Sequence, residues 1–433
     1  MENELISILR SEVKPALGCT GPIGVCYCAA QAYDAIGGEI EQIHARIDWG
    51  LCTKIDDVAY PGTQMPGVEM AVALGAICGD PAAGLEVLHN VKPECELKAR
   101  KLAKCVIIQP MWERTDLGIY VEITVVSSEG IGRAIIAHRS DGLILKERNG
   151  KVLFEAEEDA SAQSGESPIL KYKIKDLYEL AAKIPVKSLR FMKDAVEYNT
   201  RLSSETLVNN IGAGIGAALY ACKDSNRITR AKAWAAAGCE ARMSGTNIPT
   251  MSCANKGNVG IAASMPLVSL AKDLDVPQER LLRAITLSYL ISIAIIHRIG
   301  KSPAMCSCEV AASLGIAAGS VLLQGGTEEQ AEIAIQNTIP NVFGVVCDGA
   351  KLACAMRISS GTGIGFEAAD LALAGVRFAD NQGVLGNTAD DSIDIMGRTA
   401  LFGMVDSDRE LCRQLFEKRK LFPLKNFSEH QQQ

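Results

Sequence analysis

Several patterns that mark common kinds of functional site are missing from this sequence. Its 433 residues contain no C-x-x-C pair, no G-x-x-x-x-G-K-[S/T] phosphate-binding loop and no H-E-x-x-H motif. None of the five histidines lies within the main group of cysteines, the histidines being His44, His89, His138, His297 and His430. We therefore expect neither a structural zinc site nor a P-loop nucleotide site.

Long apolar runs and blocks of one charge are also missing. The longest uncharged apolar stretch, residues 284–296, is shorter than the ~20 residues of a membrane span. The first residues are acidic and lack a cationic stretch followed by an apolar one, so we expect no secretory signal. The net charge of −7 is scattered and forms no basic stripe for nucleic acid. These absences predict a cytoplasmic protein whose partner is a small molecule, without nucleic-acid or membrane partners.

Cysteine, in contrast, is abundant. There are 15 cysteines, and 48% of the chain is hydrophobic, enough to bury the cores of two or three domains. In a small secreted protein so many cysteines would suggest a disulfide framework. In a long chain without a secretory signal they favour free thiols, a metal or catalysis, and their odd number argues against complete pairing.

The first part of the chain mixes helix and strand patterns. Helices are expected at about residues 22–37, 68–78 and 92–104, and strands at 41–48, 105–109, 118–127, 131–138 and 143–146. An acidic, serine-rich segment at residues 155–167 is a candidate boundary. The pattern predicts an α+β N-terminal domain over residues 1–170.

From residue 174 onward the pattern is helical, with alanine and glycine dense on the faces that should pack. Two G-x-G-x-G segments, residues 212–216 and 361–365, follow no expected strand, so close packing or a loop explains them better than dinucleotide binding. The pattern predicts an all-helical C-terminal domain over residues 171–433. The same small residues would also suit packing between copies, so a homo-oligomer stays open. Helices are expected at about 174–183, 187–222, 228–243, 277–298, 308–324, 327–338, 349–359 and 364–376.

Three cysteines of the helical part form a candidate metal site. Cys347 and Cys354 are seven positions apart, which on an α-helix is about two turns, so both thiols would project from one face. Cys306 is a third thiol that can meet them there. Three thiolates without a fourth favour a [4Fe–4S] cluster with one iron open to substrate, because an electron-transfer cluster normally takes four cysteines.

A fourth cysteine belongs to a different kind of environment. Cys19 follows a turn rich in proline and glycine and precedes an expected helix that starts at Thr20 or Pro22. Free backbone N–H groups at a helix N-terminus stabilise a thiolate. A buried structural cysteine is the alternative reading of the same pattern.

A loop rich in glycine, asparagine and serine is a candidate carboxylate site. It comprises Arg242 to Gly245 together with residues 251–261, in which backbone N–H groups and amide side chains can hold a carboxylate. Simple turn geometry is the other explanation for these residue types.

Six short motifs, taken together, resemble the L-cysteine desulfidase family, which is related to the α part of the bacterial iron–sulfur L-serine dehydratases. The likeness runs from about residue 12 to about residue 380. In chain order the motifs are Pro15-Ala-Leu-Gly-Cys19-Thr, Pro61-Gly-Thr, Ala241-Arg-Met, Gly257-Asn258, Cys306-x-Cys308-x-Val310-Ala-Ala and Cys347-Asp-Gly-Ala-x-x-x-Cys354-Ala-Met.

The resemblance implies a serine dehydratase α-like fold and a [4Fe–4S]-dependent β-elimination without pyridoxal phosphate. L-cysteine would yield sulfide, ammonia and pyruvate. Carried over by position, the cluster ligands would be Cys306, Cys347 and Cys354, with Cys308 as an alternative ligand, and Cys19 would be the catalytic thiol. The remaining positions would bind the amino-acid substrate, and they are Thr20, Arg242, Lys256 and Asn258.

The sequence departs from the family near this expected pocket. Gly21 stands where the family usually has glutamate, and Lys256 and Val259 replace a serine and a glutamine. Another thiol, hydroxy or small acid substrate therefore stays open, as does dehydration of serine, since iron can also accept hydroxide. A non-catalytic iron–sulfur sensor and a helical protein with free buried cysteines are further alternatives.

Overall fold

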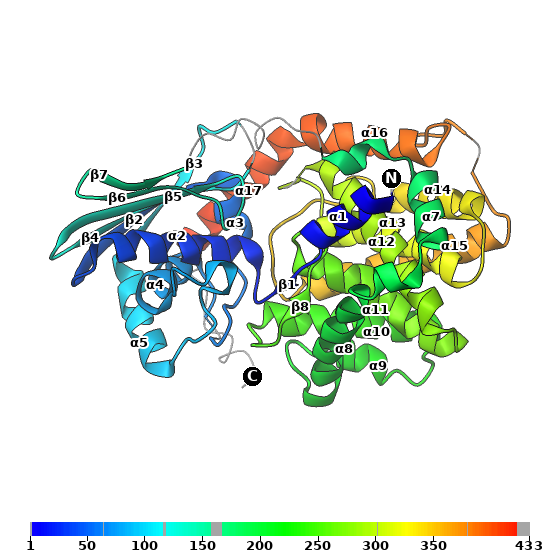
Figure 1. Ribbon diagram of the computed structural model, residues 1–433, viewed down its shortest axis with the longest axis horizontal. Coiled ribbons are helices and arrows are strands. Elements are labelled where there is room, and N and C mark those ends of the chain that lie inside the picture. The colour runs from blue at the N-terminus through cyan, green and yellow to red at the C-terminus, as the bar shows by residue number, and fades with distance from the viewer. Residues whose placement is uncertain are drawn as a thin grey trace.

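The computed structural model describes residues 2–63, 65–115, 118–156, 167–300, 302–378 and 380–421. A sheet with its covering helices lies on the left of Figure 1, and a body of packed helices lies on the right. This arrangement agrees with the predicted α+β part followed by a helical part. The division at residue 170 stays a prediction, and most of the expected acidic boundary, residues 157–166, lies outside the described residues.

The sheet has six strands in the order β3-β2-β4-β5-β6-β7. Strands β2 and β3 are parallel and the other neighbours are antiparallel. The sequence predicted the first five strands within a few residues and missed β7, the edge strand. Their bounds are β2 (Ile40–Asp48), β3 (Val106–Met111), β4 (Tyr120–Ser127), β5 (Gly130–Ala137), β6 (Leu143–Arg148) and β7 (Lys151–Glu155).

One face of the sheet is apolar because alternate residues of its strands point to the same side. Ile43 of β2 pairs with Val125 of β4, and Ile47 pairs with Val121, and all four side chains are fully buried. Helix α2 (Thr20–Ile36) lies along this face, with α4 (Val68–Cys78) and α5 (Pro93–Leu102) beyond it (Figure 1). The N-terminus of α2 is thereby fixed at the end of the sheet that faces the helical body.

The helical body has its own hydrophobic core. The N-terminal helix α1 (Glu2–Glu12) contributes Leu5, Ile8 and Leu9 to it, and β1 (Pro15–Ala16) pairs with β8 (Thr250–Met251). Its other helices include α7 (Ile174–Lys183), α8 (Met192–Asn209), α9 (Ile215–Tyr220), α10 (Arg227–Met243), α11 (Gly257–Leu274), α12 (Gln278–Ile299), α13 (Ser307–Leu323), α14 (Glu328–Val342), α15 (Cys354–Leu373) and α16 (Ala389–Arg398).

Small residues let these helices approach closely, as the sequence predicted. A side chain at Gly315 of α13 would lie 2.5 Å from the carbonyl oxygen of Ser288 in α12. In the second G-x-G-x-G segment, a side chain at Gly365 of α15 would lie 2.7 Å from the carbonyl oxygen of Ser313. This segment is therefore a helix-packing motif.

The first G-x-G-x-G segment is a loop whose backbone N–H groups bind a buried carboxylate. The backbone N–H groups of Ile215 and Gly216 donate to Glu240 at 2.9 and 2.7 Å. Glu240 is fully buried, so these bonds satisfy a charge that would otherwise be costly to bury. The loop serves the fold and gives no support to dinucleotide binding.

Helix α12 is long and apolar enough to cross a membrane by composition alone, but 83% of its most apolar window is buried inside the protein. Its tyrosine and serine side chains are satisfied there; Tyr289 donates to the carbonyl of Gly260 at 2.9 Å. The helix therefore belongs to the core that supports the helical body.

Several expected elements are wrong in position or extent. The helix expected over 187–222 is divided into a 3-10 turn (Val186–Leu189), α8 and α9, with Asn210 in the left-handed conformation that ends α8. Helix α11 was missed, because glycine and asparagine at its start were read as loop. The C-terminal helix α17 (Val405–Leu421) was also missed, and it returns to pack on α3 (Trp49–Lys54) beside the sheet (Figure 1).

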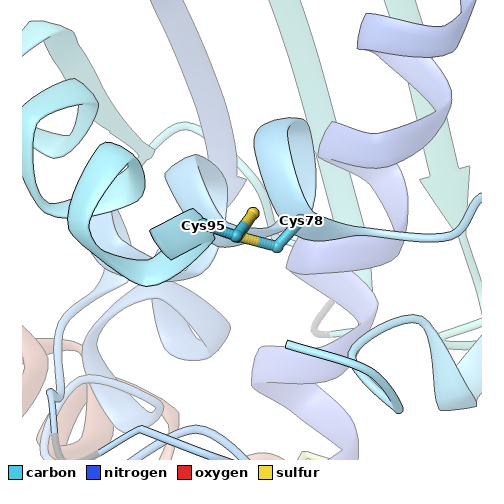
Figure 2. The surroundings of a disulfide bond; sticks show 2 residues. All are labelled: Cys78 and Cys95. Carbon is cyan, nitrogen blue, oxygen red and sulfur yellow. A yellow bond between two sulfur atoms is a disulfide. The ribbon is translucent and has the colours of Figure 1, made fainter. Parts of the chain in front are cut away.

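One disulfide departs from the expectation of free thiols. It joins Cys78 at the end of α4 to Cys95 in α5, whose Cα atoms are 5.8 Å apart (Figure 2). The other cysteines are free, including all of those in the candidate site.

Candidate functional site

A cavity of about 210 Å³ lies between the sheet region and the helical body. The sheet side contributes the start of α2 and one face of α3, and the helical side contributes the starts of α11, α13 and α15. Every site residue predicted from the sequence lines this one cavity, and these residues are Cys19, Thr20, Arg242, Lys256, Asn258, Cys306, Cys347 and Cys354. Their individual roles stay predictions.

Two of the cysteines are brought together by a short backbone ladder. The N–H of Cys306 donates to Val345 at 2.8 Å, and the N–H of Cys347 donates to Ala304 at 2.7 Å. Cys306 then serves as the N-cap residue of α13, and only 3% of it is exposed. The ladder joins segments that are far apart in sequence, which periodicity alone could not show.

The expected helical relation between Cys347 and Cys354 is wrong. Cys347 lies in the loop before α15, and Cys354 is the first residue of that helix. Gly349, with φ +96°, turns the chain between them, and a helix cannot include that conformation. The two thiols still reach the same cavity, because the turn folds the loop back over the helix start.

Cys308 lies among the three predicted ligands. Its sulfur is 3.5 Å from that of Cys306, and it also interacts with Cys354. These hydrogen bonds keep the proton on Cys308 and raise its pKa, whereas the bond from Cys308 lowers the pKa of Cys354 to about 6. The cavity thus offers a fourth thiol next to the predicted set.

These thiols fit an iron–sulfur cluster better than a single ion. Within the described ranges, no three histidine, cysteine, aspartate or glutamate side chains gather closely enough to hold one metal ion. A cubane cluster makes a different demand, because each of its cysteines binds a separate iron. Thiolates spread around one cavity wall meet that demand.

Cys19 occupies the predicted position at a helix start. It is the N-cap residue of α2, and its thiol makes no capping hydrogen bond. Gly18 precedes it with φ +71°, and a side chain there would lie 2.7 Å from Pro61. The close contact explains why a glycine precedes Cys19 and why the Pro61 turn accompanies it.

Arg242 joins the Cys19 turn to the start of α11. Its guanidinium donates to the carbonyl of Gly18 at 2.8 Å and to the side-chain oxygen of Asn258 at 2.9 Å. Only 5% of Arg242 is exposed, and its Nε has no hydrogen-bond partner among the residues that the structure describes. Within the described residues its hydrogen bonds go to neutral oxygens, so a buried cation faces the cavity without a carboxylate bound to it.

The other two predicted substrate residues differ in position. The Thr20 hydroxyl donates to the carbonyl of Asn255 at 3.1 Å, which ties α2 to the loop before α11. Lys256 is the N-cap residue of α11 and lines the cavity, and burial lowers its pKa. Thr20 therefore ties two parts of the cavity wall together, and Lys256 brings an amino group whose positive charge burial disfavours.

The structure explains one departure from the family pattern. A side chain at Gly21 would lie 3.0 Å from Ile55 and 3.2 Å from Leu51, both on the α3 side of the cavity. A side chain at position 21 would therefore begin in close contact with these apolar groups. Glycine at position 21 therefore allows the start of α2 to pack closely against the apolar wall formed by α3 and Ile55.

Three charged residues of the cavity were missed by sequence reasoning. Lys54 comes from α3, while Asp348 and Arg357 flank the cysteine loop and pair at 3.1 Å. Burial lowers the pKa of Lys54, but neighbouring Cys347 and Asp408 raise it by more, so it lies above its ordinary value. The only sequence signal was the Cys-Asp-Gly-Ala motif, which contains Asp348.

The glycine of this motif is required by close packing against α3. A side chain at Gly349 would lie 2.9 Å from the carbonyl oxygen of Lys54, and that same oxygen accepts a hydrogen bond from Ala350 at 2.8 Å. The cysteine loop therefore rests directly on the end of α3.

Gly349→Ala is expected to lower the free energy of unfolding by about 1–3 kcal/mol for the left-handed backbone alone, and by more because of the clash. Gly344→Ala is the matched control, because Gly344 also has positive φ (+80°) but no atom of the described part of the chain lies within 4 Å of the added methyl. Urea unfolding measures both. Equal losses in the two variants would show that the contact with Lys54 is unimportant.

The chain is similar to known proteins over most of its length. A family model described as serine dehydratase alpha chain matches residues 82–413, which include the four cysteines that line the cavity from the helical side. The chain is 34% identical over 427 residues to a UPF0597 protein of Clostridium botulinum (97% of this chain, 100% of the relative). UPF0597 proteins of Clostridium tetani and Phocaeicola vulgatus are each 33% identical, over 96% and 94% of this chain and 99% and 95% of their own lengths.

The match covers well over half of the chain, and the relatives align along nearly their whole length. Such a relationship indicates a lyase-type enzyme related to the alpha part of the iron–sulfur serine dehydratases. The chain belongs to the serine dehydratase alpha chain family.

Proposed function

We propose that this protein is a cytoplasmic [4Fe–4S]-dependent lyase that eliminates sulfide from L-cysteine or a close analogue, without pyridoxal phosphate. The observation that carries the proposal is the convergence, in one cavity, of three candidate ligand thiols, the helix-capping Cys19 and the buried Arg242. Cys306, Cys347 and Cys354 would hold the cluster. A bound cluster supplies a Lewis-acidic iron for the departing sulfur.

Arg242 is suited to bind the substrate carboxylate. Its guanidinium is already desolvated and oriented by Gly18 and Asn258, so a carboxylate gains charge-assisted hydrogen bonds at little further cost in ordering. Since Gly18 immediately precedes Cys19, the same contacts hold the bound carboxylate and the thiol at a fixed separation.

Cys19 is the candidate base. As a thiolate it takes the proton from the α-carbon, the C–H electron pair forms the double bond to the β-carbon, and the β-carbon–sulfur bond breaks with its electrons leaving on sulfur. Transfer of that proton from Cys19 to the released HS− gives hydrogen sulfide and restores the thiolate. The aminoacrylate product becomes an imine, and one water hydrolyses it to pyruvate and ammonia. The sum is L-cysteine plus water giving hydrogen sulfide, ammonia and pyruvate.

The experiment is anaerobic reconstitution followed by assays of sulfide and pyruvate with L-cysteine. We expect a brown protein with iron–sulfur absorbance and equal amounts of the two products. If no such absorbance develops after reconstitution, the proposal is wrong. If a cluster forms but neither L-cysteine nor any thiol or hydroxy amino acid in a panel reacts, the sensor alternative replaces the lyase.

Dehydration of L-serine is a second candidate, favoured by the match to the serine dehydratase alpha chain family. The same residues would act, with hydroxide as the leaving group. The ratio of kcat/KM for L-cysteine and L-serine decides between the two, since both substrates yield pyruvate and only L-cysteine yields sulfide.

Arg242→Lys is expected to lower kcat/KM about 10–100-fold, mainly through KM, because a lysine cannot make the paired hydrogen bonds worth about 1.5–3 kcal/mol. Steady-state kinetics over a range of substrate concentrations measures the effect. Arg230→Lys is the control: it lies on the same helix, α10, and binds Asp273 outside the cavity. An unchanged KM in the Arg242 variant would contradict carboxylate binding by this residue.

A further inference from the structure

Lys54 is a fixed, largely buried cation where three segments meet. Its ammonium lies 2.7 and 2.8 Å from the two carboxylate oxygens of Asp408 and donates to the carbonyl of Pro303 at 3.2 Å. Only 12% of the Lys54 side chain and 2% of the Asp408 side chain are exposed. A lysine held by three oxygens has little freedom to move out of the cavity wall.

The same residue adjoins the loop of candidate ligands. Its carbonyl accepts a hydrogen bond from Ala350, and Gly349 packs against its backbone. Lys54 and Cys347 line the cavity together and are electrostatic neighbours. Of the other cations there, Arg357 pairs with Asp348 and Glu309 on the cysteine-loop side, and Lys256, which also neighbours Cys347, lies at the start of α11 on the helical side. Among the cavity residues that the structure describes, Lys54 is thus the cation that the sheet side presents to Cys347.

We propose that Lys54 stabilises the bound iron–sulfur cluster, by setting a positive charge, held in place by Asp408, against the negative charge that the thiolate ligands bring into the cavity. The inference rests on the proposed function, because it assumes that Cys306, Cys347 and Cys354 hold the cluster. Anionic groups removed from water need a nearby cation. Lys54 supplies such a cation to Cys347 from the sheet side of the cavity.

The C-terminal helix α17 takes part in the site through Asp408. The same helix packs on the sheet side through other contacts: Arg409 lies over Trp49 at 5.5 Å, and Phe416 meets Trp112 edge-on at 6.2 Å. Docking of α17 thus determines where the Lys54 ammonium lies. Cluster stability is thereby coupled to the packing of a helix that contributes no ligand.

The test follows the release of iron from the reconstituted full-length protein to a coloured chelator under anaerobic conditions, without substrate. Lys54→Met is expected to release iron about 10–100-fold faster than wild type, the range found when groups around metal ligands are removed. Lys54→Arg keeps a cation and is expected to release iron more slowly than Lys54→Met. Arg413→Met is the control, because it removes a cation of α17 that lies over Trp112, outside the cavity.

A double variant separates the charge at the cluster from a general loss of fold. Lys54→Met alone leaves Asp408 buried without its partner, whereas Lys54→Met with Asp408→Asn removes both charges and is expected to keep the fold. We expect the double variant to melt near wild type yet still release iron faster. Release at the wild-type rate from either methionine-containing variant would overturn the inference, as would equal rates for Lys54→Met and Lys54→Arg.

The readout also keeps the two proposals apart. A wild-type protein that binds a cluster but forms no sulfide or pyruvate overturns the lyase activity and leaves the role of Lys54 standing if the variants differ as expected. An active lyase whose Lys54 variants hold iron as firmly as wild type overturns only the role of Lys54. A protein that takes up no cluster overturns both.

Discussion

Cys347→Ala is expected to abolish both the iron–sulfur absorbance and the formation of sulfide and pyruvate. Cys347 is a proposed ligand that lines the cavity beside Cys306 and Cys354, and its backbone is fixed by the hydrogen bond to Ala304. Loss of a ligand should exceed the about 100-fold effect typical of the groups that surround ligands. Iron content per chain, visible absorbance and anaerobic activity, measured on one preparation, check the prediction.

Two other cysteines serve as controls for this experiment. Cys222 is free and exposed outside the cavity, so Cys222→Ala should keep full iron content and activity. Cys308→Ala tests the spare thiol: if Cys308 is only a hydrogen-bond partner of Cys306 and Cys354, a cluster still assembles in this variant. Wild-type iron content in Cys347→Ala, with loss of the cluster in Cys308→Ala, would reassign the ligand set.

Cys19→Ala is expected to keep the cluster and lose activity by about 10²–10⁴-fold, the usual contribution of a positioned acid or base. The loss should fall on kcat, since Arg242 still holds the carboxylate and the ligand thiols are untouched. Retention of the visible spectrum together with loss of pyruvate formation is the diagnostic combination.

The control for this variant lies further along the same helix. Cys28 is buried in α2 and its thiol donates to backbone carbonyls of the sheet, so Cys28→Ala perturbs α2 without reaching the cavity. A similar fall in activity for Cys28→Ala and Cys19→Ala would indicate that disturbance of α2, rather than loss of a base, explains the effect. Full activity in Cys19→Ala would remove Cys19 from the mechanism.

The elements that sequence reasoning placed well are those with a strong local period. Strand β2 alternates buried Ile43, Ala45 and Ile47 with outward residues, and α7 begins and ends where its amphipathic pattern does. The elements that were missed or wrong depend on contacts distant in sequence. Helix α11 starts with Gly257, whose lack of a side chain admits the Arg242 guanidinium; a side chain there would lie 2.3 Å from its Nε. Because the reason for this glycine lies in a distant contact, the local sequence pattern predicts a turn there and not the start of a helix.

The relation between Cys347 and Cys354 is a clearer case of local structure that is decided by a contact distant in sequence. Their spacing suggested one helix, but the left-handed Gly349 between them is held by its contact with α3, almost 300 residues away in sequence. The helical argument for a shared site was therefore wrong, although the two thiols still line the same cavity because the turn brings them there by another route.

By itself, the sequence determined which residue types were available for chemistry: a surplus of cysteines without a zinc pattern, a cysteine at a helix start, and a helical part rich in small residues. Only the tertiary structure decided that Lys54 and Arg357 join the site and that Asp408 of α17 holds Lys54 there. The reason is physical. Helix and strand periods depend on residues that are close in sequence. A cavity is lined by segments that are distant in sequence, and its charged groups are those that the fold of these segments places along its wall.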